Sequence, residues 1–218
     1  MKFSAIIFDL DGTIINSEKQ WGMAFLEVLN KLGVKTDEDH HVRGLSIKSN
    51  WQTILSKYKV KTDKTPEELE MLTYIEYAKL IPEIELNDGV LEFMDVLAES
   101  DLSLALATSS NWEITDKIIN YFKLNGRFES ITTIEEVVSP KPAPDIFLLT
   151  AEKLGIDPVD CLVIEDSLPG ITAAHEAGMK VIAINSDEER EDELDDADLI
   201  VQGFSEINLK AIDSMHQD

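Results

Sequence analysis

The chain has 218 residues, and 44% of them are hydrophobic, which is enough for a packed core and too many for a disordered chain. Its 43 acidic side chains outnumber its 19 basic ones and give a formal net charge of −24. This balance argues against a nucleic-acid-binding protein and against one that binds an anionic membrane surface. A phosphorylated substrate remains compatible with it, because a bound divalent cation can reverse the local field.

The single cysteine, Cys161, excludes an intrachain disulfide, which fits a reducing compartment, and we interpret it as a small buried residue. No segment approaches the roughly 18 apolar residues of a membrane span. Asp9 interrupts the apolar run after Lys2 before a signal-peptide core is complete. We therefore expect a soluble, cytoplasmic protein.

Continuous apolar runs predict the strands of a parallel sheet. The first is Ala5–Phe8, whose side chains suit a strand that is buried on both faces. Three later segments share this character: Leu102–Ala107, Cys161–Ile164 and Val181–Ile184. Leu199–Val201 is a shorter strand candidate, and Ser130–Ile134, which contains hydroxyl side chains, is a weaker one. Apolar residues at helical spacing separate several of them, in the segments 114–122, 146–154 and 171–177. Strands that alternate with helices predict an α/β fold with a doubly wound parallel sheet.

The segment between Ser17 and Ile84 breaks this alternation, because it contains helical stripes and no apolar run typical of a buried strand. We interpret residues 17–84 as an all-helical insert, and residues 1–16 and 85–218 as the α/β core. We expect hinges near Asn16 and near Pro82 to Gly89. The acidic run 187–198 is typical of a solvated loop and helix face.

Two aspartates follow the first predicted strand. Asp9 and Asp11, with Gly12 next to them, lie at the carboxyl edge of the sheet, where open α/β folds bind ligands. Two carboxylates at this spacing can serve a metal and a reacting group, although Asp-Gly is also a common turn pair. A calcium loop is excluded, because its sixth position is Ile14 where the sharp turn needs glycine.

Three further segments end at the same edge of the predicted sheet. The segment 108–111 offers hydroxyls and backbone N–H groups that suit a phosphate, or a simple helix N-cap. Lys141 lies between two prolines, which stiffen the chain around it, although a lysine in such a loop is commonly solvated. Glu165 and Asp166 follow a buried strand, where two acids are costly unless they cap a turn or bind a cation.

Together, these four segments resemble the motifs of the haloacid dehalogenase superfamily of phosphotransferases. The chain is most similar to the branch with a helical cap after the first strand, which holds β-phosphoglucomutase-like sugar-phosphate phosphatases. The resemblance extends over nearly the whole chain. It implies a Rossmann-like core with an inserted cap domain, and a monomer that acts on a small phosphorylated molecule.

The resemblance also implies a role for each motif residue. Asp9 is expected to be the nucleophile that forms an aspartyl phosphate. Asp11 is expected to protonate the leaving oxygen and then activate water, and its presence favours phosphate esters, because dehalogenases lack it. Mg²⁺ is expected to bind the Asp9 carboxylate, the Asp11 carbonyl and Asp166, with Glu165 acting through a water or another ligand. The phosphoryl oxygens are expected to bind three further residues: Thr108, Ser109 and Lys141.

In this family the cap supplies the residues that select the substrate. The candidates here are Glu18, Trp21, Arg43, Gly44, Lys48 and Asn50. Each exposed charge among them could equally be solvated. The four histidines have no metal-ligand spacing, and we assign them no role.

Three functions remain in competition: a Mg²⁺-dependent phosphatase, a phosphosugar mutase and a silent binding module on the same fold. The β-phosphoglucomutases carry a histidine and an arginine where this chain has Trp21 and Ile47, which can neither carry a positive charge nor relay a proton. We therefore favour a phosphatase of sugar or polyol phosphates, with the Trp21 ring facing a reduced sugar. Asn16 stands where the hexose- and hexitol-phosphate phosphatases often have aspartate, so the subgroup stays open.

Overall fold

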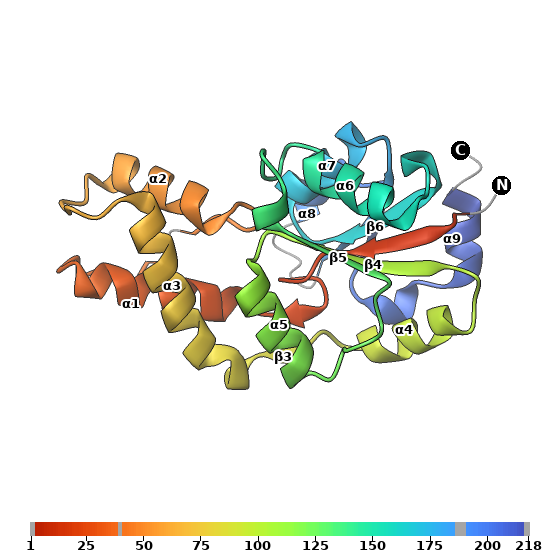
Figure 1. The fold of residues 1–218 in the computed structure, drawn as a ribbon, viewed down its shortest axis with the longest axis horizontal. Helices are drawn as coiled ribbons and strands as arrows, with labels where there is room; N and C mark the ends of the chain where they lie inside the picture. Colours follow the sequence, from red (N-terminus) through yellow and green to blue (C-terminus); the bar gives the residue numbers. More distant parts are fainter. Residues whose placement is uncertain (1–2, 39–40, 186–190, 216–218) are drawn as a thin grey trace.

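A computed structural model describes residues 3–38, 41–185 and 191–215. Its centre is a six-stranded parallel sheet in the order β5-β4-β1-β6-β7-β8 (Figure 1). The strands are β1 (Ala5–Phe8), β4 (Ser103–Thr108), β5 (Ser130–Thr133), β6 (Cys161–Glu165), β7 (Lys180–Ile184) and β8 (Leu199–Val201). All six segments expected to be strands are strands, which confirms the predicted α/β fold.

Helices cover both faces of this sheet. Helices α4 (Val90–Ala98), α5 (Trp112–Tyr121) and α9 (Leu209–Met215) pack on one face, and α6 (Asp145–Leu154), α7 (Leu168–Glu176) and α8 (Glu191–Leu194) on the other. Figure 1 shows α6 and α7 above the sheet and α4 and α5 below it. Side chains of β1 alternate between the two cores, since Ile6 and Phe8 join the first and Ala5 and Ile7 the second. The sheet is therefore buried on both faces.

Between β1 and β4, three helices form a group beside the sheet, which we call the helical insert (Figure 1). They are α1 (Glu18–Lys31), α2 (Ile47–Tyr58) and α3 (Pro66–Leu80). Helix α3 begins with a capping box between Thr65 and Glu68 and has proline as its first residue, both of which favour helix initiation. The Trp51 indole of α2 is buried and donates a hydrogen bond to Thr73 Oγ1 of α3 at 2.8 Å.

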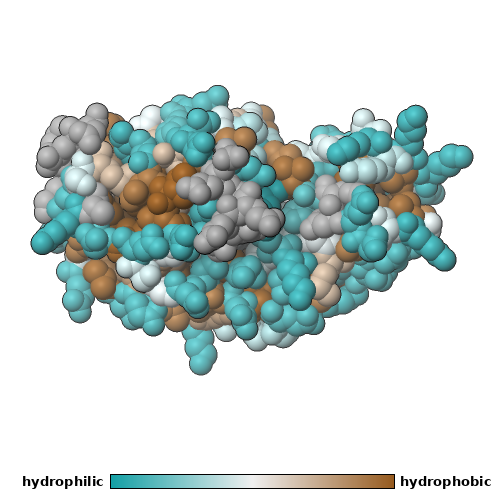
Figure 2. All heavy atoms as spheres, turned by 180° about the vertical axis from the view of Figure 1, so that it is seen from behind, coloured by the Kyte–Doolittle hydropathy of each residue, from teal (hydrophilic) through white to brown (hydrophobic). Residues whose placement is uncertain are grey.

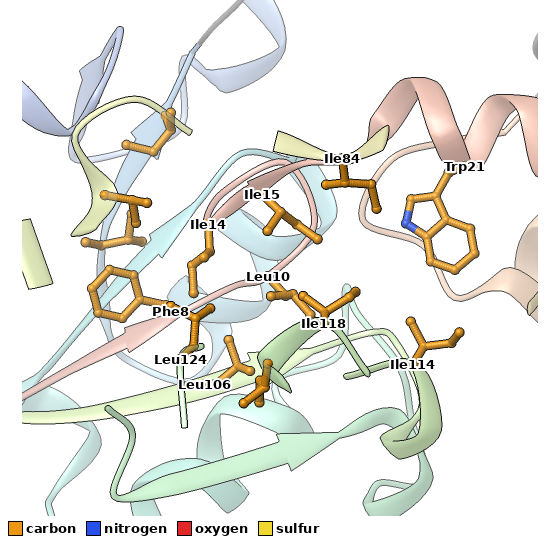
Figure 3. Packing of buried hydrophobic residues seen from close by; sticks show 14 of the residues in the cluster. Phe8, Leu10, Ile14, Ile15, Trp21, Ile84, Leu106, Ile114, Ile118 and Leu124 are labelled. Atoms are coloured by element: carbon orange, nitrogen blue, oxygen red, sulfur yellow. The ribbon is translucent and has the colours of Figure 1, made fainter. Parts of the chain in front are cut away.

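The insert joins the core through a two-stranded antiparallel ribbon of β2 (Ile15–Asn16) and β3 (Glu85–Leu86). These strands lie where hinges were expected, but two residues are too few to produce a strand pattern in a sequence. One hydrophobic cluster passes through this junction, and Figure 3 shows Ile14, Ile15 and Ile84 between the sheet residues and Trp21. The insert is thus packed onto the core in this structure.

Short 3₁₀ turns complete the described secondary structure, at Ile81–Glu83, Ile134–Glu136, Pro158–Asp160 and Phe204–Glu206. Hydrophilic residues predominate on the face shown in Figure 2. Of the acidic run, residues 187–190 lie outside the described residues, and α8 buries Leu194 while Glu193 and Asp195 are exposed. Within the described ranges, no helix is long and apolar enough to cross a membrane.

Candidate active site

The strands β4, β1 and β6 are neighbours in the middle of the sheet, and their carboxyl ends lie side by side at one edge. The register places Phe8 opposite Leu106 of β4 and Ile164 of β6, and the Asp9 N–H continues the ladder by donating to the Ile164 carbonyl at 2.9 Å. The motif residues that follow these strands are therefore brought to one place, at the point where the chain turns to opposite sides of the sheet.

Lys141 forms the centre of this site. Its Nζ lies 2.6 Å from Asp9 Oδ1 and 2.7 Å from Glu165 Oε1, and only 2% of the residue is exposed. The structure therefore rules out a solvated lysine here. Burial alone lowers the pKa of Lys141, but the two carboxylates outweigh it and hold that pKa above its ordinary value. Burial raises the pKa of Asp9 well above its usual range, although the ammonium acts in the opposite direction.

The other Glu165 oxygen stabilises the turn after β6. Glu165 Oε2 accepts hydrogen bonds from the backbone N–H groups of Asp166 and Ser167 at 2.8 and 2.9 Å, and from Ser167 Oγ at 2.9 Å. Ser167 in turn caps α7 by accepting from the Gly170 N–H. Both oxygens of Glu165 thus bind protein donors, and an indirect role of Glu165 toward a metal stays a prediction.

Three carboxylates form a cluster that fits a hard cation. One oxygen from each of Asp9, Glu165 and Asp166 lies within 4.8 Å of the others, and all three residues are buried. Gly12 has a φ of +86°, and a Cβ atom at this position would overlap the Asp166 carboxylate. The cluster therefore depends on a glycine next to it, and its oxygen ligands are those that Mg²⁺ prefers.

The surroundings of Asp11 differ from those of Asp9, because its carboxylate accepts hydrogen bonds from neutral donors. Its Oδ1 accepts hydrogen bonds from Ser17 Oγ at 2.7 Å, Trp21 Nε1 at 2.8 Å and the Tyr77 hydroxyl at 3.0 Å. Its Oδ2 accepts one from Ser110 Oγ at 2.8 Å. Burial and the Asp11 charge raise the pKa of Tyr77 well above its ordinary value, so the phenol remains a donor.

Trp21 was expected to present a ring face to the substrate. In the structure it stacks face to face on Tyr77, with ring centroids 3.5 Å apart and an interplanar angle of 6°. The residue is only 4% exposed, and Figure 3 shows its indole nitrogen on the side of Ile84. One face of the indole is therefore covered by protein, and a sugar contact through Trp21 stays a prediction.

The polar side chains of residues 108–111 form hydrogen bonds with several different partners. Asn111 caps α5 by accepting from the Ile114 N–H at 2.9 Å, so the capping interpretation holds for this residue. Thr108 Oγ1 accepts from the Ser110 N–H at 3.0 Å, and Ser109 Oγ donates to the Gly44 carbonyl at 3.3 Å. Sequence reasoning missed the contact of Ser110 with Asp11, since a hydroxyl two residues beyond the strand has no distinctive spacing.

The loop before α2 lies directly on the core. Gly44 has a φ of +75°, and a Cβ atom there would overlap the Ser167 hydroxyl. On the other side of the site, Glu18 Oε2 lies 3.0 Å from Arg43 Nε and 2.9 Å from His41 Nε2. His41, to which the sequence assigned no role, therefore belongs to this group; nothing in its spacing pointed to Glu18.

These groups enclose a small pocket beside the aspartates. Its volume is about 40 Å³, which is room for little more than a water molecule. Its lining includes Asp9, Asp11, Glu18, Trp21, His41, Arg43 and Gly44. A sugar phosphate is too large for this volume, so the insert lies close against the core in this structure.

Two candidate residues of the insert lie outside the lining of that pocket. The Asn50 amide accepts from the Val42 N–H at 2.6 Å and donates to the Val42 carbonyl at 3.1 Å, which fixes the loop. Lys48 forms an ion pair with Glu67 at 2.8 Å and lines a separate cleft of about 870 Å³ between the insert and the core. Direct substrate contacts of Asn50 and Lys48 stay predictions.

Comparison with known proteins identifies the family. A family model described as haloacid dehalogenase-like hydrolase matches residues 6–184. The chain belongs to this family. Asp9, Lys141 and Asp166, the motif residues on which the family resemblance rests, lie together in this structure as a candidate active site.

Relatives of this hydrolase include phosphatases and a mutase. Hexitol phosphatase B of Escherichia coli K12 is 31% identical over 195 residues, which cover 86% of each chain. Beta-phosphoglucomutase of Bacillus subtilis is 28% identical and covers 95% of this chain and 93% of that protein. The structure of CbbY from Rhodobacter sphaeroides in complex with phosphate superimposes with a TM-score of 0.82 at 25% identity, covering 94% of this chain and 96% of that one. These findings confirm the sugar-phosphate branch and favour a phosphoric monoester hydrolase over a silent binding module.

We predict that Lys141→Met lowers the free energy of unfolding by about 3–5 kcal/mol at pH 7, because two buried carboxylates lose their counter-charge. Urea unfolding in a chelator measures this loss. Burial raises the pKa of Asp9, so the folded variant binds more protons than the unfolded variant as the pH falls. The loss in free energy of unfolding, relative to the unaltered chain, should therefore be smaller at pH 5 than at pH 7. The control is Lys117→Met, which removes an exposed pair with Glu113 and should change stability by less than about 1 kcal/mol. Equal losses in the two variants would contradict the prediction.

Proposed function

We propose that this hydrolase is a Mg²⁺-dependent phosphatase of small phosphate monoesters, with sugar or polyol phosphates as substrates. The observation that carries the proposal is the buried Asp9 carboxylate, which lies between the Lys141 ammonium and Asp166 at the carboxyl edge of β1. A nucleophile flanked by a fixed cation and a cation-binding carboxylate suits the attack on a phosphoryl group. We further propose that the protein is a cytoplasmic monomer.

The reaction requires two steps on this chain's residues. In the first, an Asp9 carboxylate oxygen attacks phosphorus, the ester P–O bond breaks, and Asp11 gives its proton to the leaving alkoxide. In the second, Asp11 takes a proton from a water molecule, which attacks the same phosphorus and releases inorganic phosphate from Asp9. Lys141, Thr108 and the Ser109 N–H are suited to hold the phosphoryl oxygens in both steps.

The residues that would hold Mg²⁺ are the Asp9 carboxylate, the Asp11 carbonyl and Asp166, with Glu165 acting indirectly. When bound, the cation supplies positive charge that keeps the crowded carboxylates ionised and offsets their repulsion of a phosphate. The raised pKa of Asp9 supports this assignment, because burial without a cation disfavours the charged form that a nucleophile needs.

We propose that residues 17–84 form a cap domain on a core of residues 1–16 and 85–218. The support is that α1–α3 pack on one another and that the chain enters and leaves this group through the β2–β3 ribbon. The pocket beside Asp9 has a volume of about 40 Å³, and this small size supports a cap that moves away from the core to admit the substrate.

A phosphatase is favoured over a mutase by the residues that face the reaction. Ile47 is buried and lines the small pocket, so the loop offers no cation at that position. The cation that does line the pocket is Arg43, and its Nε is paired with Glu18. A substrate with one phosphate fits such a pocket better than a bisphosphate, which needs a second anion site. Glu18, Arg43 and Gly44 remain the candidates for contact with the leaving group.

We predict that Asp9→Asn abolishes phosphate release from p-nitrophenyl phosphate, with a loss of about a thousandfold or more, because an amide cannot act as the nucleophile. Circular dichroism should show an unchanged fold. The matched control is Asp95→Asn on α4, where the carboxylate is exposed and pairs with Arg127, and its rate should equal that of the unaltered chain. If Asp9→Asn kept more than a few per cent of the rate of phosphate release, the covalent mechanism would be wrong.

We predict that a chelator eliminates turnover and that Gly12→Ala raises the Mg²⁺ concentration for half-maximal rate by about tenfold or more, because the new methyl group displaces Asp166. Gly126→Ala is the control, since this glycine also has a positive φ, +79°, but has no atom within 4 Å of the added carbon. Both variants carry backbone strain, and only Gly12→Ala disturbs the carboxylates. The same Mg²⁺ dependence in both variants would argue against Asp166 as a ligand.

We predict that β-glucose 1-phosphate, incubated with Mg²⁺ and a trace of the 1,6-bisphosphate, releases inorganic phosphate faster than it forms glucose 6-phosphate. A panel of sugar, polyol and nucleotide phosphates, assayed in parallel, should show the fastest release from a sugar or polyol ester. Faster formation of glucose 6-phosphate would favour the mutase, and preference for nucleotides would overturn the substrate class.

A further inference from the structure

We infer that Trp21 and Tyr77 are positioning residues that fix the Asp11 carboxylate so that Oδ2, and not Oδ1, exchanges the proton with the leaving group. This inference rests on the proposed function, because it concerns the acid step of the phosphatase reaction. The observation behind it is the unequal number of donors on the two carboxylate oxygens.

Three donors converge on Asp11 Oδ1, from Ser17, Trp21 and Tyr77, at 2.7, 2.8 and 3.0 Å. An indole nitrogen can only donate a hydrogen bond, so Oδ1 cannot carry a proton that points toward Trp21. The Ser17 and Tyr77 hydroxyls also donate to this oxygen, so a proton on Oδ1 would disturb more hydrogen bonds than a proton on Oδ2, which has one donor. When Asp11 acts as the acid, its proton therefore belongs on Oδ2.

The partner of Oδ2 is compatible with both states of Asp11. Ser110 Oγ lies 2.8 Å from this oxygen. A protonated carboxyl oxygen keeps a lone pair, so Oδ2 can accept from Ser110 while its own proton faces the leaving oxygen. Oδ2 can thus lose and regain a proton without leaving a buried polar group unpaired. The proton passes from Oδ2 to the alkoxide oxygen as the ester P–O bond breaks, and in the second step it returns from water.

Packing holds the two aromatic donors in place. Trp21 and Tyr77 are stacked in parallel, both are buried, and Tyr74 contacts Trp21 edge-on with ring centroids 5.9 Å apart. Trp21 comes from α1 and Tyr77 from α3, so the packing of these two helices sets the direction of both donors. Rigid donors can fix a carboxylate to within the small angular range that proton transfer needs.

The test uses Tyr77→Phe, which removes one donor and keeps the ring stack, and compares two classes of ester by kcat/KM. An alkoxide needs a proton to leave, whereas p-nitrophenolate does not, so only the alkyl ester depends on a well-placed acid. For the alkyl phosphate that the unaltered chain hydrolyses best, we expect kcat/KM to fall about ten- to a hundredfold. For p-nitrophenyl phosphate, we expect a change of less than about threefold. Trp21→Phe should show the same selective loss.

Tyr74→Phe is the matched control. Tyr74 lies on the same helix, is also buried and contacts Trp21, but its hydroxyl has no hydrogen-bond partner in the described part of the chain. Its kcat/KM for both esters should equal that of the unaltered chain. Thermal unfolding of each variant checks that the fold is retained.

Equal falls for the two esters in Tyr77→Phe would show a general structural role and overturn the inference, as would no fall for either. In both cases the unaltered chain still hydrolyses phosphate esters, so the proposed function stands. Release of phosphate from neither ester by the unaltered chain would instead overturn the proposed function and this inference together.

Discussion

The candidate active site depends on one buried ammonium group between two carboxylates. In a chain with a net charge of −24, the carboxyl ends of β1 and β6 bring further acids together where water is excluded. Lys141 reaches this place from the loop before α6 and bonds to Asp9 and Glu165 at once. Without it the parallel register of the sheet would place like charges side by side with nothing to separate them.

Two aspartates only two residues apart are thereby given opposite surroundings. Asp9 contacts a cation supplied by the core, and burial governs its charge. Asp11 contacts neutral O–H and N–H donors, and Trp21 and Tyr77 among them come from the helical insert. Reactions that need a nucleophile and a separate proton donor require this kind of division, in which similar groups differ through their neighbours. The core thus supplies the cation beside Asp9, whereas donors from both the core and the insert hold Asp11.

The sequence was informative where a feature is encoded within one short segment of the chain. Apolar runs such as Cys161–Ile164 located the strands, and the motif segments located Asp9, Lys141 and Asp166, which the fold brings together. The contact between Tyr77 and Asp11 spans 66 positions, and a tyrosine within a helical stripe is indistinguishable from an ordinary core residue. The two-residue strands of the ribbon and the pairing of His41 with Glu18 were missed for the same reason, because only the folded chain places these partners next to each other.

The residue that follows the ribbon holds the loop after β1 in place. The Asn87 side-chain amide, one residue after β3, donates to the carbonyls of Gly12 and Thr13 at 2.7 and 2.6 Å. The donors from Trp21 and Tyr77 reach Asp11 from the insert, so the insert is not an interchangeable module. A recombined protein that receives the helices of a relative would have to supply new donors for Asp11. Diversification of substrate range in this architecture is therefore constrained by a single carboxylate that both halves of the protein must orient.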